Sequence, residues 1–340
     1  MTRSVKVLLV LVCILALAAG FALAQDEKIP GPKGSIHARS VAPTALKHRG
    51  TQGSPHPPYS LASSGTPAPK RPAARTTAPT PLVTGLLGYH AGLQYSGLYD
   101  PYGIAVSYRG DRIYFTEYDD SDVYLLYNKQ YKTYLDIDWY AGPIRNRGNL
   151  YFTASDYGYG DIYRIGPEGK VQPLGWAGYG CDYISAIDVD LATGAVYFTM
   201  NCGESDWSGL FVLLPRDFGG EATLLDWWYG DPCYGLAVKG NKIYTTSYWY
   251  DTVWVCDKWA EDWDLFLSGF DGPCDLGFDK LGNLFVAEWD GGSVARVRPG
   301  SANVARIAVG LYDPYYLEID GLNRVFVSDT HAGNIWMFWK

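Results

Sequence analysis

The chain has 340 residues, of which 47% are hydrophobic and only 19% are charged, so it has ample apolar material for a core and is not wholly disordered. The many glycines (39) and tyrosines (28) favour strands and turns over a helical bundle or coiled coil. The net charge is −8 and the acidic excess lies beyond residue 81, which excludes the basic footprint of a nucleic-acid-binding protein.

The first 24 residues have the pattern of a secretory signal peptide. Arg3 and Lys6 precede an uncharged apolar run, and Ala22-Leu23-Ala24 fits the small-residue cleavage site. We expect an exported protein, extracellular or periplasmic, with no membrane span after the signal is removed. The alternative is an uncleaved N-terminal anchor.

Residues 25–81 form the next segment, which is basic and rich in proline, serine, threonine and alanine. Frequent prolines prevent regular strand pairing and helix formation. We predict a disordered linker. It could tether the next domain to an acidic surface, carry O-linked glycans, or act as a passive spacer.

Six repeats follow over residues 82–340. Each joins a short apolar strand, a Gly/Asn turn and a second strand with an aromatic anchor. The anchors are Tyr114, Tyr151, Tyr197, Tyr244, Phe285 and Phe326. A period of about 42 residues with short strands is typical of propeller blades of four strands each. The sequence therefore predicts an all-β, six-bladed β-propeller of four-stranded antiparallel blades.

Closure of the ring can also be predicted. After Phe326 only one more strand follows, at residues 335–339, so the last blade lacks its outer strand. The segment Leu82–Leu86 is similar to Val304–Val309, which precedes the sixth repeat. We expect this N-terminal segment to complete the last blade, which removes the exposed strand edges of an open ring.

Two pairs of motifs carry a family resemblance. Gly103–Val106 with Tyr114–Glu117 resembles NHL and YWTD repeats, and Asn283–Trp289 with Gly291–Val297 resembles a gluconolactonase blade. The chain thus resembles the six-bladed propeller superfamily, which also includes virginiamycin B lyase. The resemblance is specific for the fold, which hosts many activities.

The enzymatic relatives imply a divalent metal in the central channel, held by a glutamate, asparagines and an aspartate. Here the first-blade turn Pro101-Tyr102-Gly103 has no acid, and Cys233-Tyr234-Gly235 has no asparagine. Asp275 lies one position from the expected aspartate. The resemblance to the lyase would place Glu117 and Glu288 at its Thr-Glu motif, but neither has an accompanying histidine.

Several acidic side chains should share one rim of the propeller. Glu117, Asp275, Glu288 and Asp329 could surround the channel and bind Ca²⁺ or another divalent cation through oxygen ligands. The alternative is ordinary turn chemistry with no bound cofactor. On the same rim, His331 could meet His90 near Asp329 as a general base or metal pair, or both could be surface histidines.

Aromatic residues are the stronger signal on this rim. Consecutive residues such as Trp227-Trp228-Tyr229 cannot all point inward, so we expect a recognition surface, with extra packing between blades as the alternative. Aromatic faces beside carboxylates suit sugars or cationic peptides. The candidate binding residues are Tyr102, Glu117, Trp228, Tyr234, Trp249, Asp275, Glu288, Trp289, Tyr315, Asp329 and His331.

Five cysteines remain after the signal segment. By position, Cys181 could pair with Cys202 and Cys233 with Cys274, each as a disulfide, which leaves Cys256 over.

These features favour an exported binding or scaffold module whose rim meets a glycan, a peptide or an extracellular protein. One alternative is an enzyme, a metal-dependent lactonase, esterase or lyase with a divergent channel site. A further alternative is a structural protein of the cell envelope.

Overall fold

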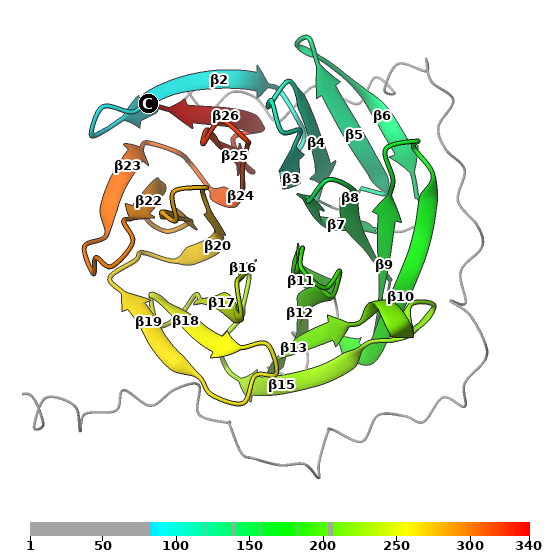
Figure 1. Ribbon diagram of the computed structural model, residues 1–340. Coiled ribbons are helices and arrows are strands. Elements are labelled where there is room, and N and C mark those ends of the chain that lie inside the picture. The colour runs from blue at the N-terminus through cyan, green and yellow to red at the C-terminus, as the bar shows by residue number, and fades with distance from the viewer. Residues whose placement is uncertain (1–81, 119, 138–139, 157, 182, 203–206) are drawn as a thin grey trace, which may run out of the picture.

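The computed structural model describes residues 82–118, 120–137, 140–156, 158–181, 183–202 and 207–340, which form six sheets around a central axis (Figure 1). The prediction of an all-β, six-bladed propeller is confirmed. The signal-peptide and linker predictions concern residues 1–81 and lie outside the described residues. Within the described ranges, no helix has the length and apolar character needed to cross a membrane.

Each blade is a sheet of four antiparallel strands, in which the first strand lies nearest the axis and the fourth lies on the outside. Blades one to three are β3 (Pro101–Val106), β4 (Arg112–Glu117), β5 (Asp122–Tyr127) and β6 (Gln130–Asp136); β7 (Tyr140–Asn146), β8 (Leu150–Asp156), β9 (Gly158–Ile165) and β10 (Val171–Cys181); and β11 (Tyr183–Val189), β12 (Val196–Cys202), β13 (Trp207–Leu213) and β15 (Thr223–Tyr229). Blades four to six are β16 (Leu236–Lys239), β17 (Lys242–Ser247), β18 (Thr252–Asp257) and β19 (Asp264–Ser268); β20 (Pro273–Phe278), β21 (Leu284–Glu288), β22 (Ser293–Val297) and β23 (Ala305–Val309); and β24 (Pro314–Ile319), β25 (Val325–Asp329), β26 (Asn334–Trp339) and β2 (His90–Ser96).

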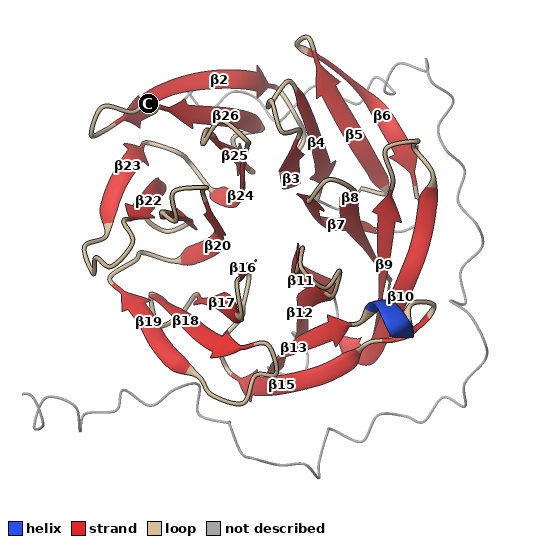
Figure 2. Cartoon of the chain, viewed as in Figure 1, coloured by secondary structure: helices blue, strands red, loops and turns tan. Residues whose placement is uncertain are grey.

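Two very short strands extend two of these sheets. β14 (Gly220–Glu221) pairs with β10 in the second blade, and β1 (Thr84–Gly85) pairs with β23 in the fifth. The one helical element among the described residues is the single 3-10 turn η2 (Pro215–Asp217), shown in Figure 2.

The six anchor aromatics lie in the six second strands, β4, β8, β12, β17, β21 and β25. The hydroxyl residues beside them explain why the repeat contains threonine or serine. Thr116 Oγ1 donates to Gly142 O in the next blade (3.0 Å), Thr246 Oγ1 to Cys274 O (2.7 Å), and Ser328 Oγ to Tyr102 O (2.7 Å). The repeated hydroxyl thus joins each of these blades to the first strand of its neighbour.

Glycines in the first strands permit this close approach. A Cβ at Gly235 would lie 2.2 Å from Cys274 O, and one at Gly142 would lie 2.3 Å from Thr153 Oγ1. A side chain at Gly235 would require a shift of the backbone of the next blade, and one at Gly142 would displace the Thr153 side chain of its own blade.

Closure by an N-terminal strand is confirmed, but the predicted segment is wrong. The outer strand of the last blade is β2, whose His90 pairs with Trp339 and Ser96 with Asn334. Leu82–Leu86 contributes only β1, which joins the fifth blade beside β23. The segment that it resembles, Val304–Val309, contains the strand with which it pairs.

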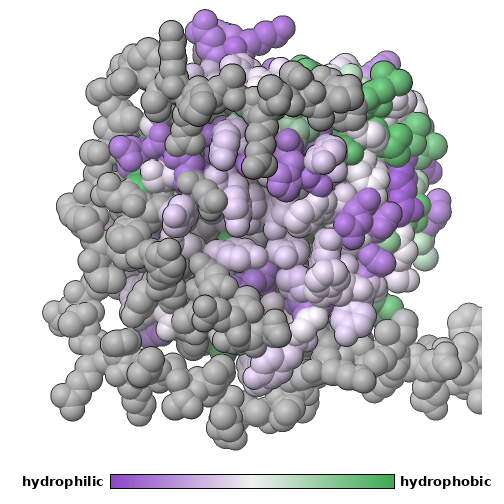
Figure 3. Space-filling model, turned by 180° about the vertical axis from the view of Figure 1, so that it is seen from behind, coloured by the Kyte–Doolittle hydropathy of each residue, from purple (hydrophilic) through white to green (hydrophobic). Residues whose placement is uncertain are grey.

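The turns divide the molecule into two faces. We call the face with the turns between second and third strands the mouth face, and the face with the turns between first and second strands the base face. η2, in a third-to-fourth strand turn of the base face, points toward the viewer in Figure 2. Figure 3 therefore looks onto the mouth face, where the uncovered centre is mostly pale, the colour of residues of intermediate hydropathy such as tyrosine and tryptophan.

Candidate functional site

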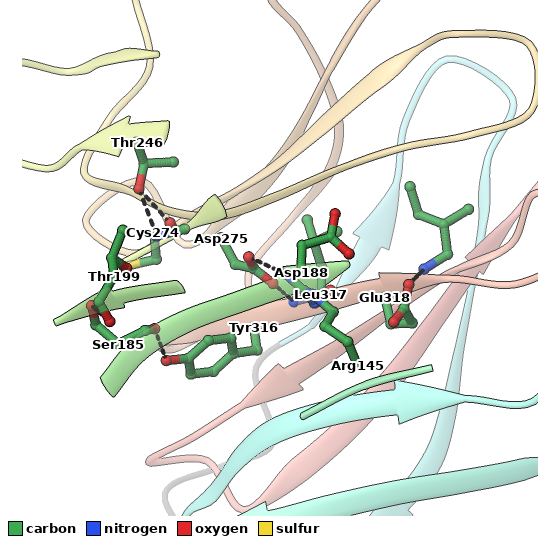
Figure 4. A network of polar contacts seen from close by, with 12 residues as sticks. Arg145, Ser185, Asp188, Thr199, Thr246, Cys274, Asp275, Tyr316, Leu317 and Glu318 are labelled. Atoms are coloured by element: carbon green, nitrogen blue, oxygen red, sulfur yellow. Dashed lines mark hydrogen bonds and ion pairs between the residues drawn. The ribbon is translucent and has the colours of Figure 1, made fainter. Parts of the chain in front are cut away.

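A buried ion pair crosses the axis of the propeller. Arg145 Nη2 in blade two lies 2.5 Å from Asp275 Oδ1 in blade five, directly opposite in the ring (Figure 4). Arg145 Nη1 also donates to Leu317 O (2.6 Å), and Leu317 N donates to Asp275 Oδ2 (2.9 Å). Burial raises the pKa of Asp275, and the guanidinium opposes that rise. Both carboxylate oxygens therefore have partners.

A second arginine extends this contact toward the base face. Arg147 lies 2.9 Å from Asp188 and 2.9 Å from Glu318, and Asp188 Oδ2 accepts a hydrogen bond from Val238 N (2.8 Å). We call Arg145, Arg147, Asp188, Asp275 and Glu318 the axial network. It links blades two to six by charge and hydrogen bonds.

The divalent metal implied by the resemblance does not fit these residues. Asp275, the one residue near a ligand position, already has the Arg145 guanidinium on one oxygen and a backbone amide on the other. A second cation there would be repelled by Arg145. In the described part of the chain, no three His, Cys, Asp or Glu side chains are grouped as metal ligands would be.

The described acids do not form the possible ring of carboxylates around the channel. Glu288 is fully buried and is held by Arg306 (2.7 Å) and by Ser293 Oγ, both in its own blade. Asp329 Oδ1 accepts hydrogen bonds from the backbone amides of Tyr312 and Asp313, and Glu117 Oε1 accepts one from Tyr99 N. These side chains fix the loops at the blade ends, and they do not converge with Asp275.

Tyrosines fill the axis on the side of the mouth. The ring of Tyr102 lies 5.0 Å from that of Tyr315 and 4.8 Å from that of Tyr316, and all three residues are buried. Tyr316 Oη reaches across from blade six and donates to Ser185 O in blade three (2.5 Å). Burial raises the pKa of all three tyrosines, so their hydroxyls stay neutral.

Above this plug, and including its Tyr315, lies a group of aromatic rings that we call the aromatic mouth: Tyr234, Tyr248, Trp249, Trp289 and Tyr315. Tyr315 is buried and forms the floor, and the other four are partly or largely exposed. Trp289 lies 5.1 Å from Tyr315 and 5.8 Å from Tyr248, and Tyr234 lies 5.5 Å from Tyr315 (ring centroids). Trp249 is 65% exposed and packs edge-on against Tyr248. The predicted residues Tyr102, Tyr234, Trp249, Trp289 and Tyr315 thus belong to one contiguous surface and its floor.

A histidine–aspartate pair lies at the edge of the aromatic mouth. His331 Nδ1 is 2.5 Å from Asp313 Oδ2, and the two side chains are 51% and 16% exposed. Trp289 Nε1 donates to the other oxygen of Asp313 (2.5 Å), and Asp329 holds the Asp313 backbone amide (2.7 Å). Asp313 is therefore fixed from two sides, and it orients the imidazole.

His90 and His331 do not meet, and both are exposed, as the alternative of two surface histidines predicts. His90 opens β2 opposite Trp339, whereas His331 lies beside the other end of that strand, near the Ser96–Asn334 pair. The partner of His331 is Asp313, which spacing alone did not single out. Asp290, which accepts a 2.9 Å hydrogen bond from the rim aromatic Tyr248, was also missed as a member of this surface.

Trp228 is not part of the mouth. It is 5% exposed, donates through Nε1 to Asp231 O (2.8 Å) and packs edge-on against Trp263. Trp227-Trp228-Tyr229 belongs to strand β15 rather than to a loop, and its members are half-buried, buried and exposed in turn. Packing between blades, the alternative interpretation, explains Trp228.

The predicted bridge between Cys233 and Cys274 is also wrong. Both are free, buried thiols, as is Cys256. Burial raises the pKa of the Cys233 thiol to about 12, so it stays protonated. The predicted pairing of Cys181 with Cys202 lies outside the described side chains.

No family model and no curated protein sequence matches the chain. Solved structures do. A gluconolactonase from Xanthomonas campestris has a TM-score of 0.60 and 16% identity, over 81% of this chain and 98% of that one. A luciferin-regenerating enzyme has a TM-score of 0.58 and 12% identity, over 76% and 95%. A virginiamycin B lyase from Staphylococcus aureus has a TM-score of 0.54 and 12% identity, over 74% and 99%.

All three structures are named as enzymes, and none of the three is named as a binding or scaffold protein. The expectation of a binding or scaffold module is therefore wrong. At these identities the likeness is one of fold. The chain has the six-bladed propeller fold of gluconolactonase-like and virginiamycin B lyase propellers.

Proposed function

We propose that the protein is a hydrolase of small lactones or esters whose reaction takes place at the aromatic mouth. The observation that carries the proposal is the contact between His331 and Asp313, which leaves a half-exposed imidazole on the same carboxylate as Trp289 of the aromatic mouth. One of the similar propellers is named as a gluconolactonase, which supports the same class of reaction.

The chemistry follows from the tautomer that Asp313 selects. Its carboxylate accepts the Nδ1 proton of His331, so Nε2 carries the lone pair and acts as a general base. A water molecule gives its proton to Nε2 while its oxygen attacks the acyl carbon. The acyl C–O bond then breaks, and the imidazolium returns the proton to the leaving alkoxide. No step passes through a metal ion.

The test is a screen of purified protein against lactones and esters, with EDTA present in a parallel series. We expect His331→Ala to lower kcat/KM by roughly 10² to 10⁴. His90→Ala is the matched control, because His90 lies at the far end of β2 and should leave turnover unchanged. The proposal fails if His331→Ala retains full activity, if EDTA abolishes activity, or if no lactone or ester is turned over.

A further inference from the structure

We infer that the aromatic mouth recognises a positively charged nitrogen, so that the substrate of the hydrolase carries a quaternary or protonated amine. That the bound cation is a substrate rests on the proposed function, but binding of the cation itself does not depend on turnover. Two observations support binding: where the Lys and Arg side chains of the described residues lie, and which aromatic rings they cover.

Basic side chains are segregated to one face of the propeller. Among the described residues, Lys and Arg lie in or close to turns of the base face, with two exceptions, Arg145 and Arg306. Both exceptions are neutralised, Arg145 by Asp275 and Arg306 by Glu288. The mouth face therefore has no unpaired Lys or Arg of its own in the described ranges.

Aromatic rings of the base face already have cations over them. Lys239 Nζ lies 4.1 Å from the centroid of Phe278, and Lys280 Nζ lies 4.2 Å from that of Tyr108. The other such pairs, Arg112 with Tyr127, Arg324 with Phe326, and Arg296 and Lys340 with Tyr89, lie near the same face. No ring of the aromatic mouth has a cation from the described residues.

Two carboxylates flank the uncovered rings. Asp290 is exposed and accepts a hydrogen bond from Tyr248 Oη (2.9 Å), and Asp313 accepts one from Trp289 Nε1 (2.5 Å). Each acid thereby holds a ring in place and adds negative charge beside its face. Electron-rich faces of Trp and Tyr next to carboxylates form the arrangement that binds organic cations.

The position of these rings connects recognition to reaction. Trp289 and His331 share Asp313, one through each carboxylate oxygen. A cationic group stacked on Trp289 therefore places the rest of a small substrate beside the imidazole. Neutral sugars also stack on aromatic rings, but the flanking charges and the segregated basic residues favour a cation over a neutral face.

The experiment is a comparison of choline with its neutral isostere, 3,3-dimethyl-1-butanol, by calorimetry and tryptophan fluorescence with the full chain. We expect choline to bind about 3- to 30-fold tighter. Trp289→Leu should remove this preference, whereas Trp259→Leu, an exposed tryptophan in a base-face turn, should preserve it. Asp290→Asn, at an exposed position, should weaken choline binding and its dependence on salt without disturbing the fold.

Equal binding of the two compounds, or choline binding that survives both Trp289→Leu and Asp290→Asn, would overturn the inference and assign the mouth to neutral ligands. The two proposals fail separately. Choline binding without turnover of any lactone or ester, choline esters included, leaves the inference standing and removes the proposed function. Turnover of neutral lactones with no preference for choline does the reverse.

Discussion

The axial network and the aromatic mouth lie on the same axis of one propeller, and they differ in what surrounds their polar groups. In the axial network Asp275 is fully buried and both of its oxygens have partners from other blades or elements. At the edge of the aromatic mouth the His331 side chain is half exposed, and its Nε2 atom takes no part in the contact with Asp313. The comparison teaches that acids near a propeller axis can be structural. Reactive side chains are expected instead where a polar atom has no hydrogen-bond partner within the protein.

Removal of one charge from the axial network should have the largest effect. Asp275→Ala leaves the Arg145 guanidinium buried without its carboxylate, and we expect a loss of about 3–5 kcal/mol in the free energy of unfolding. Urea denaturation measures this loss. Asp290→Ala, an exposed acid of the mouth, is the control and should change stability by no more than about 0.5 kcal/mol. Similar losses for both variants would erase the distinction between the two regions.

At the mouth the expected effect is on rate rather than stability. Asp313→Asn replaces an acceptor of the Nδ1 proton with an amide that can also donate, so the useful tautomer of His331 is no longer selected. We expect kcat to fall on the order of 10² to 10⁴ while the melting temperature changes little. The measurement is the pH profile of kcat/KM for both proteins. An unchanged profile would remove Asp313 from the reaction.

Changes at two buried acids below the mouth loops, Asp231 and Asp329, should have effects of intermediate size on stability. Neither acid forms an ion pair with a described Lys or Arg. Burial raises the pKa of Asp231 to about 6 and that of Asp329 to about 6. The folded state then holds more protons than the unfolded state between about pH 4 and pH 6, so stability falls as the pH rises through that window.

Asp231→Asn tests this sign. The amide keeps an acceptor for Trp249 N (3.1 Å in the wild type) but carries no buried charge. We expect it to gain up to about 3 kcal/mol at pH 7 and to have a flatter stability profile between pH 4 and pH 6. Denaturant midpoints over that pH range measure the change. A variant that is less stable at pH 7 would contradict the expected direction.

The smallest effect is expected from chelation. Because Arg145 already supplies the positive charge beside Asp275, EDTA should leave the melting temperature of residues 25–340 unchanged. Added Ca²⁺ should not restore the stability of Asp275→Ala, since that variant has lost the carboxylate. A clear drop in melting temperature with EDTA would show that a metal contributes to the fold.

The fold could be predicted because each repeat contains its own signal. An aromatic anchor such as Tyr114 and a hydroxyl such as Thr116 recur in the second strands, and the period between them sets the number of blades. Closure was harder to predict. Two short segments, β1 and β2, precede the first blade, and only pairing with β26 shows that β2 completes the ring.

The site could be predicted only in part. Aromatic residues at matching turns, such as Tyr102, Tyr234 and Tyr315, indicate the mouth because each repeat places them on one face. The pairs that decide the chemistry have no local signal. Asp313 and His331 are 18 positions apart, and Arg145 and Asp275 are 130 apart. The one hint of the axial network is an arginine near the end of the otherwise uncharged strand β7.

Closure by β2 also has a consequence for how the chain acquires its structure. β2 precedes the first strand of blade one in the sequence but pairs with β26, which follows every other strand of the six blades. The sixth sheet therefore cannot be completed until β26 has been made, and until then β2 lacks the strand that it pairs with in that sheet. Contacts between strands so distant in sequence make folding slow, and before they form, an exposed strand edge can pair with other chains. Closure of this propeller thus depends on a contact between the first and the last strands of the ring.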